Sequence, residues 1–350
     1  MPPVKPMLAK AVDELPDSEL ALEPKWDGFR CIVFKDGDEI VLGSRNQKPF
    51  NRYFPELLEP LRSSLPSRCV VDGELIVEID GKLDFDALGQ RIHPAESRVN
   101  MLAEKTPVSF VAFDLLALDD EDLMGSPFSD RPKALEQIAS GFTDSIHLAP
   151  MTNDRDQAMV WFHELEGAGL DGLIAKPVDA PYLPDKRSQF KLKHVRTIDC
   201  VVAGFRMHKS GDGVGSLVLG LHDGARLQHV GVAASFTAKR RVELLDEVAP
   251  FELTDLSEHP WADWMSVEAH VDGSMPGAPN RWSGASSGRD HSWHPLRPEL
   301  VVEVKYVLAT DGRFRGTTRM MRWRPDREAA SATLDQFPTL DPFDIRGVLS

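Results

Sequence analysis

The chain has 350 residues, a formal net charge of −15, and 42% hydrophobic and 27% charged residues, values that suit a globular protein large enough for two domains. No apolar run is long enough to cross a membrane, and the N-terminus lacks the apolar core of a signal peptide. Cys31, Cys69 and Cys200 show no Cys-x-x-Cys spacing. The sequence therefore argues against a disulfide framework or a zinc site and favours a cytoplasmic location.

The charges are distributed unevenly along the chain. An excess of acidic residues is unusual for a protein that binds nucleic acid, but residues 186–241 contain eleven basic and only three acidic residues. Such a region can hold a polyanion, although charge alone also fits an ordinary solvated surface. His208, Lys209 and residues 239–241 (Lys-Arg-Arg) are the candidates for phosphate contacts.

Hydrophobic periodicity and turn residues predict alternating strands and helices before residue 195. The second of two amphipathic helices should bury Met159, Phe162 and Leu165. The predicted elements are, in order, a hairpin turning at Asp36-Gly37, a helix over 55–65, a strand over 70–77, a hairpin turn at Asp80-Gly81, a strand over 108–118, helices beginning at Ser129-Asp130 and before Met159, and strands near 171–176 and 190–193.

After residue 195 the pattern changes to short strands separated by glycine-rich turns. Five strands with one inserted helix fit a small barrel of the oligonucleotide-binding (OB) kind. We therefore expect an α+β protein with domains at 1–195 and 196–330 and a C-terminal tail at 331–350. The elements behind this prediction are strands at 200–205, 216–221, 227–232, 300–308 and 318–323, a helix that Ser235 caps and that runs to Val248, and a long loop at 273–295.

Lys25 is the candidate nucleophile. In an extended segment, Glu23, Lys25 and Asp27 would share one face, beside the apolar run at 31–34. A lysine between carboxylates is commonly a surface ion pair, and it becomes a nucleophile only where burial or neighbouring cations lower its pKa. Lys191 and Lys193 alternate with apolar residues and so share a strand face, which makes them candidates for those cations.

Seven short motifs occur in an order that resembles the nucleotidyltransferase superfamily of ATP-dependent DNA ligases, RNA ligases and mRNA capping enzymes. Each motif is weak alone, but their order along nearly the whole chain is specific. Asp171 stands where the family usually has glutamate, one methylene longer. The motifs are residues 25–30 (Lys-Trp-Asp-Gly-Phe-Arg), Ser44-Arg45, residues 72–74 (Asp-Gly-Glu), 113–116 (Phe-Asp-Leu-Leu), 171–176 (Asp-Gly-Leu-Ile-Ala-Lys), 191–193 (Lys-Leu-Lys) and 324–327 (Arg-Pro-Asp-Arg).

Within this superfamily the chain is most similar to the small bacterial ligase C group. The resemblance implies a nucleotidyltransferase domain of ATP-grasp-like character, with antiparallel sheets and helices, followed by an OB-fold barrel. It also implies that Lys25 forms a covalent lysyl-AMP with ATP, that the AMP passes to the 5′-phosphate of a nick, and that the 3′-hydroxyl then expels AMP. An NAD-dependent ligase would carry a four-cysteine zinc module, which three scattered cysteines cannot supply.

The resemblance also assigns roles to other residues. Mg²⁺ is implied as a cofactor, with Asp171 as the first candidate ligand and Glu74 as the second. Glu23 can accept a hydrogen bond from the adenine amino group but not from the guanine carbonyl, which favours ATP over GTP. The residues implied in binding ATP are Glu23, Arg30 and Arg45 (phosphate or ribose), Glu74 (ribose), Phe113 (adenine stacking), Lys191 and Lys193 (α-phosphate), and Arg324, Asp326 and Arg327 (pyrophosphate).

Several alternatives stay open on the sequence. An RNA ligase would use the same lysine chemistry, and a non-enzymatic nucleic-acid-binding barrel would need no covalent AMP. The leading hypothesis is a DNA ligase that seals nicks in double-stranded DNA as a monomer, in DNA repair. End-binding or polymerase proteins are the expected partners, and no membrane is involved.

Overall fold

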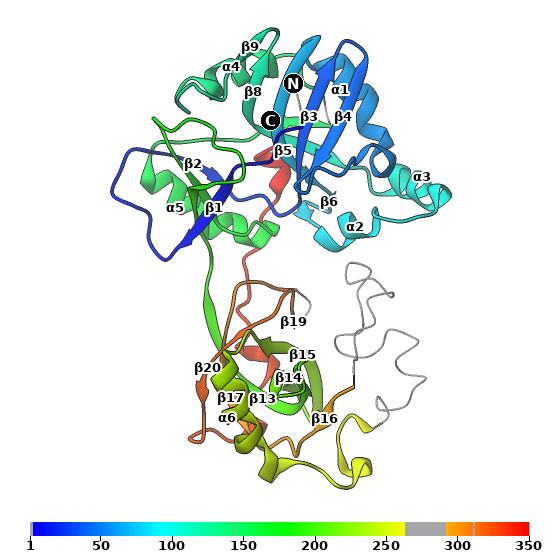
Figure 1. Cartoon of the computed structure of the whole chain (residues 1–350), viewed down its shortest axis with the longest axis vertical. Coiled ribbons are helices and arrows are strands. Elements are labelled where there is room, and N and C mark those ends of the chain that lie inside the picture. The colour runs from blue at the N-terminus through cyan, green and yellow to red at the C-terminus, as the bar shows by residue number, and fades with distance from the viewer. Residues whose placement is uncertain (1–2, 144, 263–291, 311, 350) are drawn as a thin grey trace. The chain divides into compact units, whose positions relative to one another are not determined.

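The computed structural model describes residues 3–143, 145–262, 292–310 and 312–349. The chain divides into two compact units (Figure 1). Unit 1 comprises Met1–Lys193 together with Leu340–Ser350, and unit 2 comprises His194–Thr339. Both units contain mostly antiparallel strands with helices packed against them, so the expected α+β class is confirmed. No helix among the described residues is long and apolar enough to span a membrane.

The larger sheet of unit 1 carries many of its buried apolar side chains. Its strand order is β10-β8-β5-β3-β4, and all pairs are antiparallel except β10 with β8. The predicted hairpin at Asp36-Gly37 joins β3 to β4. The strands are β3 (Phe29–Asp36), β4 (Glu39–Ser44), β5 (Arg68–Ile76), β8 (Ser109–Leu118) and β10 (Ile146–Leu148), with β9 (Glu121–Asp122) beside β8.

The smaller sheet of unit 1 positions the candidate nucleophile. Its order is β1-β12-β11-β2, and Lys25 directly follows the last residue of β2. The Lys25 N–H donates to the carbonyl of Gly172 at 2.8 Å, and the Asp171 N–H donates to the carbonyl of Lys25 at 3.1 Å. The strands are β1 (Leu8–Val12), β2 (Leu20–Pro24), β11 (Leu173–Pro177) and β12 (Arg187–Leu192).

The three predicted helices of unit 1 occur close to where the sequence places them, whereas the helices over 85–90 and 96–105 were not predicted. The region 55–65 is a 3₁₀ turn at Pro55–Leu57 followed by α1 (Leu58–Ser64). The turn at Asp80-Gly81 joins β6 (Glu78–Ile79) to β7 (Lys82–Leu83). In the helix expected to bury Met159, Phe162 and Leu165, Leu165 is buried whereas Met159 and Phe162 are only partly buried. The remaining helices are α2 (Phe85–Gln90), α3 (Glu96–Lys105), α4 (Arg131–Ala139) and α5 (Arg155–Glu164).

Unit 2 is the predicted barrel. Its sheet has the order β15-β14-β13-β17-β20, and a parallel bridge between Ala233 and Thr318 joins the two outer strands. The Ala234 N–H donates to the Thr318 carbonyl at 3.1 Å, so the sheet closes on itself. This connection pattern is that of an OB fold. The strands are β13 (Arg196–Met207), β14 (Val214–Asp223), β15 (Arg226–Ala234), β17 (Val301–Tyr306) and β20 (Arg319–Trp323).

Two local predictions in unit 2 concern the N-terminal cap of its helix and a long loop. Helix α6 (Ala238–Val248) begins after Thr237, whose side chain accepts a hydrogen bond from the Arg240 N–H, so the expected cap at Ser235 is wrong. Ser235 has φ +68°, a left-handed conformation, whereas an N-cap residue takes an extended one. Residues 273–291 of the predicted loop at 273–295 lie outside the described residues, and its last two residues form β16 (His294–Pro295).

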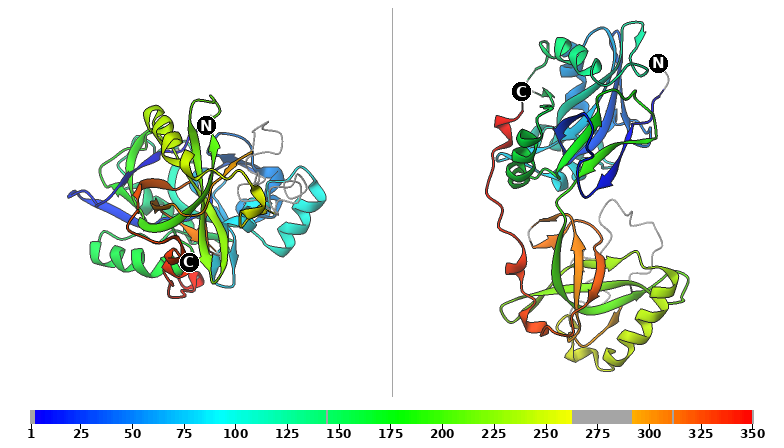
Figure 2. Two further views of the ribbon diagram at one scale, coloured as in Figure 1. Left: turned by 90° about the horizontal axis from the view of Figure 1, so that it is seen from below. Right: turned by 90° about the vertical axis from the view of Figure 1, so that its left-hand side faces the viewer.

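The last twenty residues do not behave as one tail. Residues 331–339 belong to unit 2, and the chain then returns to unit 1 (Figure 2). Ile345 is fully buried in a cluster of unit 1 that includes Trp26 and Phe113. Its N–H donates to the carbonyl of Gly81 at 2.9 Å. The C-terminal segment is thus part of the core of unit 1.

Candidate active site

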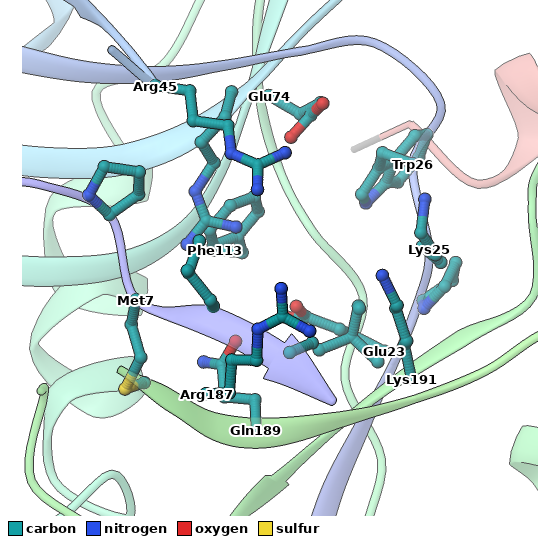
Figure 3. A pocket seen from close by; sticks show the side chains of 16 residues that line it. Met7, Glu23, Lys25, Trp26, Arg45, Glu74, Phe113, Arg187, Gln189 and Lys191 are labelled. Carbon is teal, nitrogen blue, oxygen red and sulfur yellow. The ribbon is translucent and has the colours of Figure 1, made fainter. Parts of the chain in front are cut away.

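A pocket of about 210 Å³ lies in unit 1, where its two sheets meet. Figure 3 shows charged and polar side chains from both sheets around it, with Arg45 and Glu74 on one side and Arg187, Gln189 and Lys191 on another. Seven of the predicted site residues line this pocket: Glu23, Lys25, Arg30, Arg45, Glu74, Phe113 and Lys191.

Lys25 is held at the pocket wall by Asp171. The Nζ of Lys25 lies 3.0 Å from Oδ2 of Asp171, and Nζ of Lys193 donates to the same oxygen. Asp171 is only 4% exposed. Its pKa is lowered by Lys25 and Lys193, although burial acts in the opposite direction. Asp171 Oδ1 is also buried and has no hydrogen-bond partner among the described residues.

Two glycines allow the chain to approach closely around Lys25. Gly172 has φ +113°, and a Cβ at this position would lie 2.1 Å from the carbonyl oxygen of Leu192. A Cβ on Gly28 would lie 2.0 Å from the carbonyl oxygen of Leu75. Neither site has room for a side chain. The glycines of the Lys-x-Asp-Gly and Asp-Gly motifs are therefore steric requirements of the site.

Lys191 lies on β12 and Lys193 lies just after its end, but the two side chains contact different groups. Lys191 lines the pocket, whereas Lys193 pairs with Asp171. Partial burial lowers the pKa of Lys191, and the positive charges of Lys193 and Lys25 lower it further. The predicted cluster of cations around Lys25 is therefore present.

Arg30 and Phe113 lie against each other in the pocket. The guanidinium of Arg30 is 4.3 Å from the centre of the Phe113 ring. It also donates to both oxygens of the fully buried Asp72, at 2.6 and 2.7 Å. The Tyr182 hydroxyl donates to Asp72 at 2.5 Å. A base that stacks on this face of Phe113 must therefore share or replace the contact with Arg30.

Glu23 contacts a lysine that the sequence analysis did not select. Nζ of Lys176 donates to Glu23 Oε2 at 2.8 Å and to the Phe113 carbonyl at 3.1 Å. Both side chains are almost completely buried, and burial raises the pKa of Glu23 in spite of the nearby lysine. Lys176 also lies over the rings of Phe113 and Phe128. One oxygen of the carboxylate expected to bind adenine thus already accepts a hydrogen bond within the protein.

Arg187 and Gln189 line the pocket but were not predicted as site residues, although the sequence carries a signal for them. Arg187, Gln189 and Lys191 recur with period two on β12, and all three line the pocket. The side-chain nitrogen of Gln189 is buried and has no partner among the described residues. Trp26 and residues 6–9 also line the pocket, and for these no pattern in the sequence indicated a role.

Glu74 should make the stability of unit 1 depend on pH. Burial raises its pKa to about 7, with Asp72 and Asp27 adding to the effect of burial. Between the unfolded pKa near 4.5 and the folded pKa, the folded protein keeps a proton that the unfolded chain releases, so unfolding free energy falls as pH rises. The resulting change in unfolding free energy is up to about 3 kcal/mol over this pH range, and we expect Glu74→Gln to abolish it.

Denaturant titrations from pH 4.5 to 8 would test this effect of Glu74. The difference in unfolding free energy between the wild type and Glu74→Gln should change steadily up to pH 7 and then level off. Glu78→Gln, on the nearby strand β6, is a suitable control. Parallel pH profiles for the wild type and Glu74→Gln would contradict the prediction.

The three predicted motif residues of unit 2 form a separate group. Arg324 donates to Asp326 at 3.0 Å and to Asp199 at 2.7 Å, and Arg327 also donates to Asp199. Asp199 is 5% exposed. In the sequence, Asp199 is one of the three acidic residues of the basic region 186–241, and no motif marks it as a site residue.

The candidate phosphate contacts of unit 2 are not equally available. Arg240 donates to Glu247 at 2.6 Å and also pairs with Glu243, so its charge is largely neutralised. Lys239 is highly exposed, although its Nζ lies 3.5 Å from Glu243 Oε1. Arg241 lies 3.3 Å from Nδ1 of His208, which joins two of the candidates on one surface.

Comparisons with known proteins agree with this site. The ATP dependent DNA ligase domain family matches residues 3–194, and the ATP dependent DNA ligase C terminal region family matches residues 210–327. The chain belongs to the ATP-dependent DNA ligases. Within them it is a member of the ligase C group. It is 53% identical over 342 residues to DNA ligase C of Mycobacterium tuberculosis, covering 96% of this chain and 94% of that protein.

Two further similarities support the same assignment. DNA ligase C1 of Mycolicibacterium smegmatis is 47% identical over 360 residues, with 99% of this chain and 97% of that protein covered. A solved Lig E DNA ligase superposes with a TM-score of 0.56 at 16% identity, over 91% of this chain and 99% of that chain. The latter likeness shows a shared fold. The family predicted from the seven motifs is confirmed.

Proposed function

We propose that this ATP-dependent DNA ligase seals nicks in duplex DNA with Lys25 as its nucleophile. Lys25 Nζ attacks the α-phosphorus of ATP, so a nitrogen–phosphorus bond forms while the bond to pyrophosphate breaks and the amine proton passes to solvent. The AMP moves to the 5′-phosphate of the nick, which frees Lys25. The 3′-hydroxyl then attacks that phosphate and expels AMP. Each step is an in-line phosphoryl transfer.

The observation that carries this proposal is the position of Lys25 in a pocket among other cations. Lys191 lines the same wall, and Lys193 shares the carboxylate of Asp171 with Lys25. These cations can neutralise charge on phosphate oxygens during transfer. Phe113 offers an aromatic surface to adenine, Arg30 and Arg45 suit the ribose or a phosphate, and Glu74 suits a ribose hydroxyl.

The carboxylates of Asp171 and Glu74 fit a magnesium ion that would take its other ligands from water and the phosphates of ATP. Asp171 has one oxygen engaged by two lysines and a second, buried oxygen without a partner among the described residues. The described residues hold no group of three or more His, Cys, Asp or Glu side chains suited to a metal. Mg²⁺ usually binds few carboxylates and keeps water and phosphate ligands. We propose Asp171 as its first ligand and Glu74 as its second, where the ion would neutralise phosphate charge.

Arg324, Asp326 and Arg327 are proposed to act on the pyrophosphate of ATP during the first step. Forked guanidinium groups recognise phosphate oxygens well. Lys209, Lys239 and Arg241 are proposed to contact the DNA backbone, a kind of contact that carries no sequence information. We further propose that the protein acts as a monomer in DNA repair, where end-binding or polymerase proteins supply the other activities.

A label chase would test the proposed substrate. Purified protein is first stripped of bound AMP with pyrophosphate and then incubated with α-³²P-ATP, with and without Mg²⁺. We expect an acid-labile protein label that depends on Mg²⁺. Chasing it with nicked duplex DNA should release AMP and yield sealed strands, whereas an all-RNA nicked duplex should stay unsealed. Sealing of RNA alone would favour an RNA ligase, and absence of label from folded protein would refute the enzymatic proposal.

A further inference from the structure

Asp199 links the two arginines of the 324–327 motif. Nη1 of Arg324 donates to Asp199 Oδ2 at 2.7 Å, and Nη1 of Arg327 donates to the same oxygen. Asp199 is only 5% exposed, while the side chains of Arg324 and Arg327 are 20% and 28% exposed. One buried carboxylate therefore holds two guanidinium groups that remain accessible to solvent.

The backbone around Asp199 is also held in place. Asp199 lies on β13, where it pairs with Glu303 of β17. The side chain of Gln336 accepts a hydrogen bond from the Asp199 N–H at 3.2 Å and donates to the Asp199 carbonyl at 3.0 Å. The carboxylate thus projects from a backbone that is fixed on both sides.

The remaining contacts of the two arginines fix the planes of their guanidinium groups. Nε and Nη2 of Arg324 donate to Asp326 at 3.0 and 2.8 Å. Nε and Nη2 of Arg327 donate to the side chain and backbone of Ser331, both at 3.0 Å. Each terminal nitrogen carries a second N–H that these bonds do not use. Both groups can therefore keep their present orientation while binding another anion.

Two adjacent positive charges would repel each other without a negative charge between them. We propose that Asp199 is a positioning residue for the first step of the reaction: it aligns Arg324 and Arg327 as a preformed site for the pyrophosphate oxygens of ATP. This inference rests on the proposed function, because it assumes that the two arginines act on pyrophosphate. Asp199 itself touches neither ATP nor DNA.

The test separates the first step from the last one. Asp199→Asn keeps the shape of the side chain but removes its charge, so the charge-assisted bonds to both arginines are weakened. We expect kcat/KM for protein adenylation by ATP to fall about tenfold or more. Sealing of nicked DNA that already carries the 5′-AMP should change less than twofold, because that step involves no pyrophosphate. Asp246→Asn, an exposed acid on helix α6 of the same unit, is the matched control.

A double-mutant comparison shows whether Asp199 acts through the arginines. In a chain that already carries Arg324→Ala and Arg327→Ala, Asp199→Asn should cause no further loss of adenylation. Additive losses, or equal slowing of adenylation and of sealing, would overturn the inference. If Asp199→Asn does not fold, Asp199→Glu keeps the charge but shifts it by one methylene and should show the same selective loss. Failure of the wild type to form protein–AMP would instead refute the proposed function itself.

Discussion

Replacing Lys25 by alanine should abolish the covalent protein–AMP adduct and lower nick sealing from ATP by more than about a thousandfold, because the nucleophile itself is removed. The protein should stay folded, since Asp171 keeps its ion pair with Lys193. Labelling with α-³²P-ATP followed by denaturing electrophoresis measures the adduct directly, and thermal unfolding checks the fold.

A second substrate separates the loss of the nucleophile from a general loss of activity. Nicked DNA that already carries the 5′-AMP does not need Lys25 as a nucleophile, so Lys25→Ala should retain far more activity on it than on unmodified nicked DNA. Lys10→Ala, an exposed lysine of the same unit, is the control and should label like the wild type. A covalent label that persists on Lys25→Ala would place the nucleophile elsewhere.

Replacing Ile345 by aspartate should destabilise unit 1 by about 3 kcal/mol or more. Ile345 is fully buried against a cluster that includes Trp26 and Phe113, so the substitution would bury an unpaired carboxylate. Because Trp26 and Phe113 line the proposed ATP pocket, adenylation should fall together with stability. Differential scanning calorimetry should show an earlier transition for unit 1.

The control for Ile345 lies next to it in the chain. Arg346 is exposed and pairs with Asp344 at the surface, so Arg346→Ala should change stability by less than about 1 kcal/mol. A chain that ends at Thr339 should show the same loss as Ile345→Asp, because it lacks the whole C-terminal segment. Unchanged unfolding and adenylation in the shortened chain would mean that this segment is a passive tail.

Much of the fold could be predicted because its signals are local. The apolar run at 31–34 and the Asp36-Gly37 turn mark the β3–β4 hairpin, and glycine-rich turns separate the barrel strands of unit 2. The short motifs also contain Lys25 and five further pocket residues: Arg30, Arg45, Glu74, Phe113 and Lys191. Lys191 was found through strand periodicity, and the same periodicity could have added Arg187 and Gln189.

The tertiary structure decided the contacts between residues far apart in the chain. Glu23 pairs with Lys176 across neighbouring strands, and Asp199 with Arg324 and Arg327 across the barrel sheet. Ile345 packs beside Trp26 although the whole second unit separates them in the sequence. Composition and periodicity report which face of an element is buried, but the partner of a buried charge depends on strand order and register. The sequence by itself therefore determined the family, the candidate for the nucleophile and many of the elements, whereas the charge pairs and the C-terminal packing required the fold.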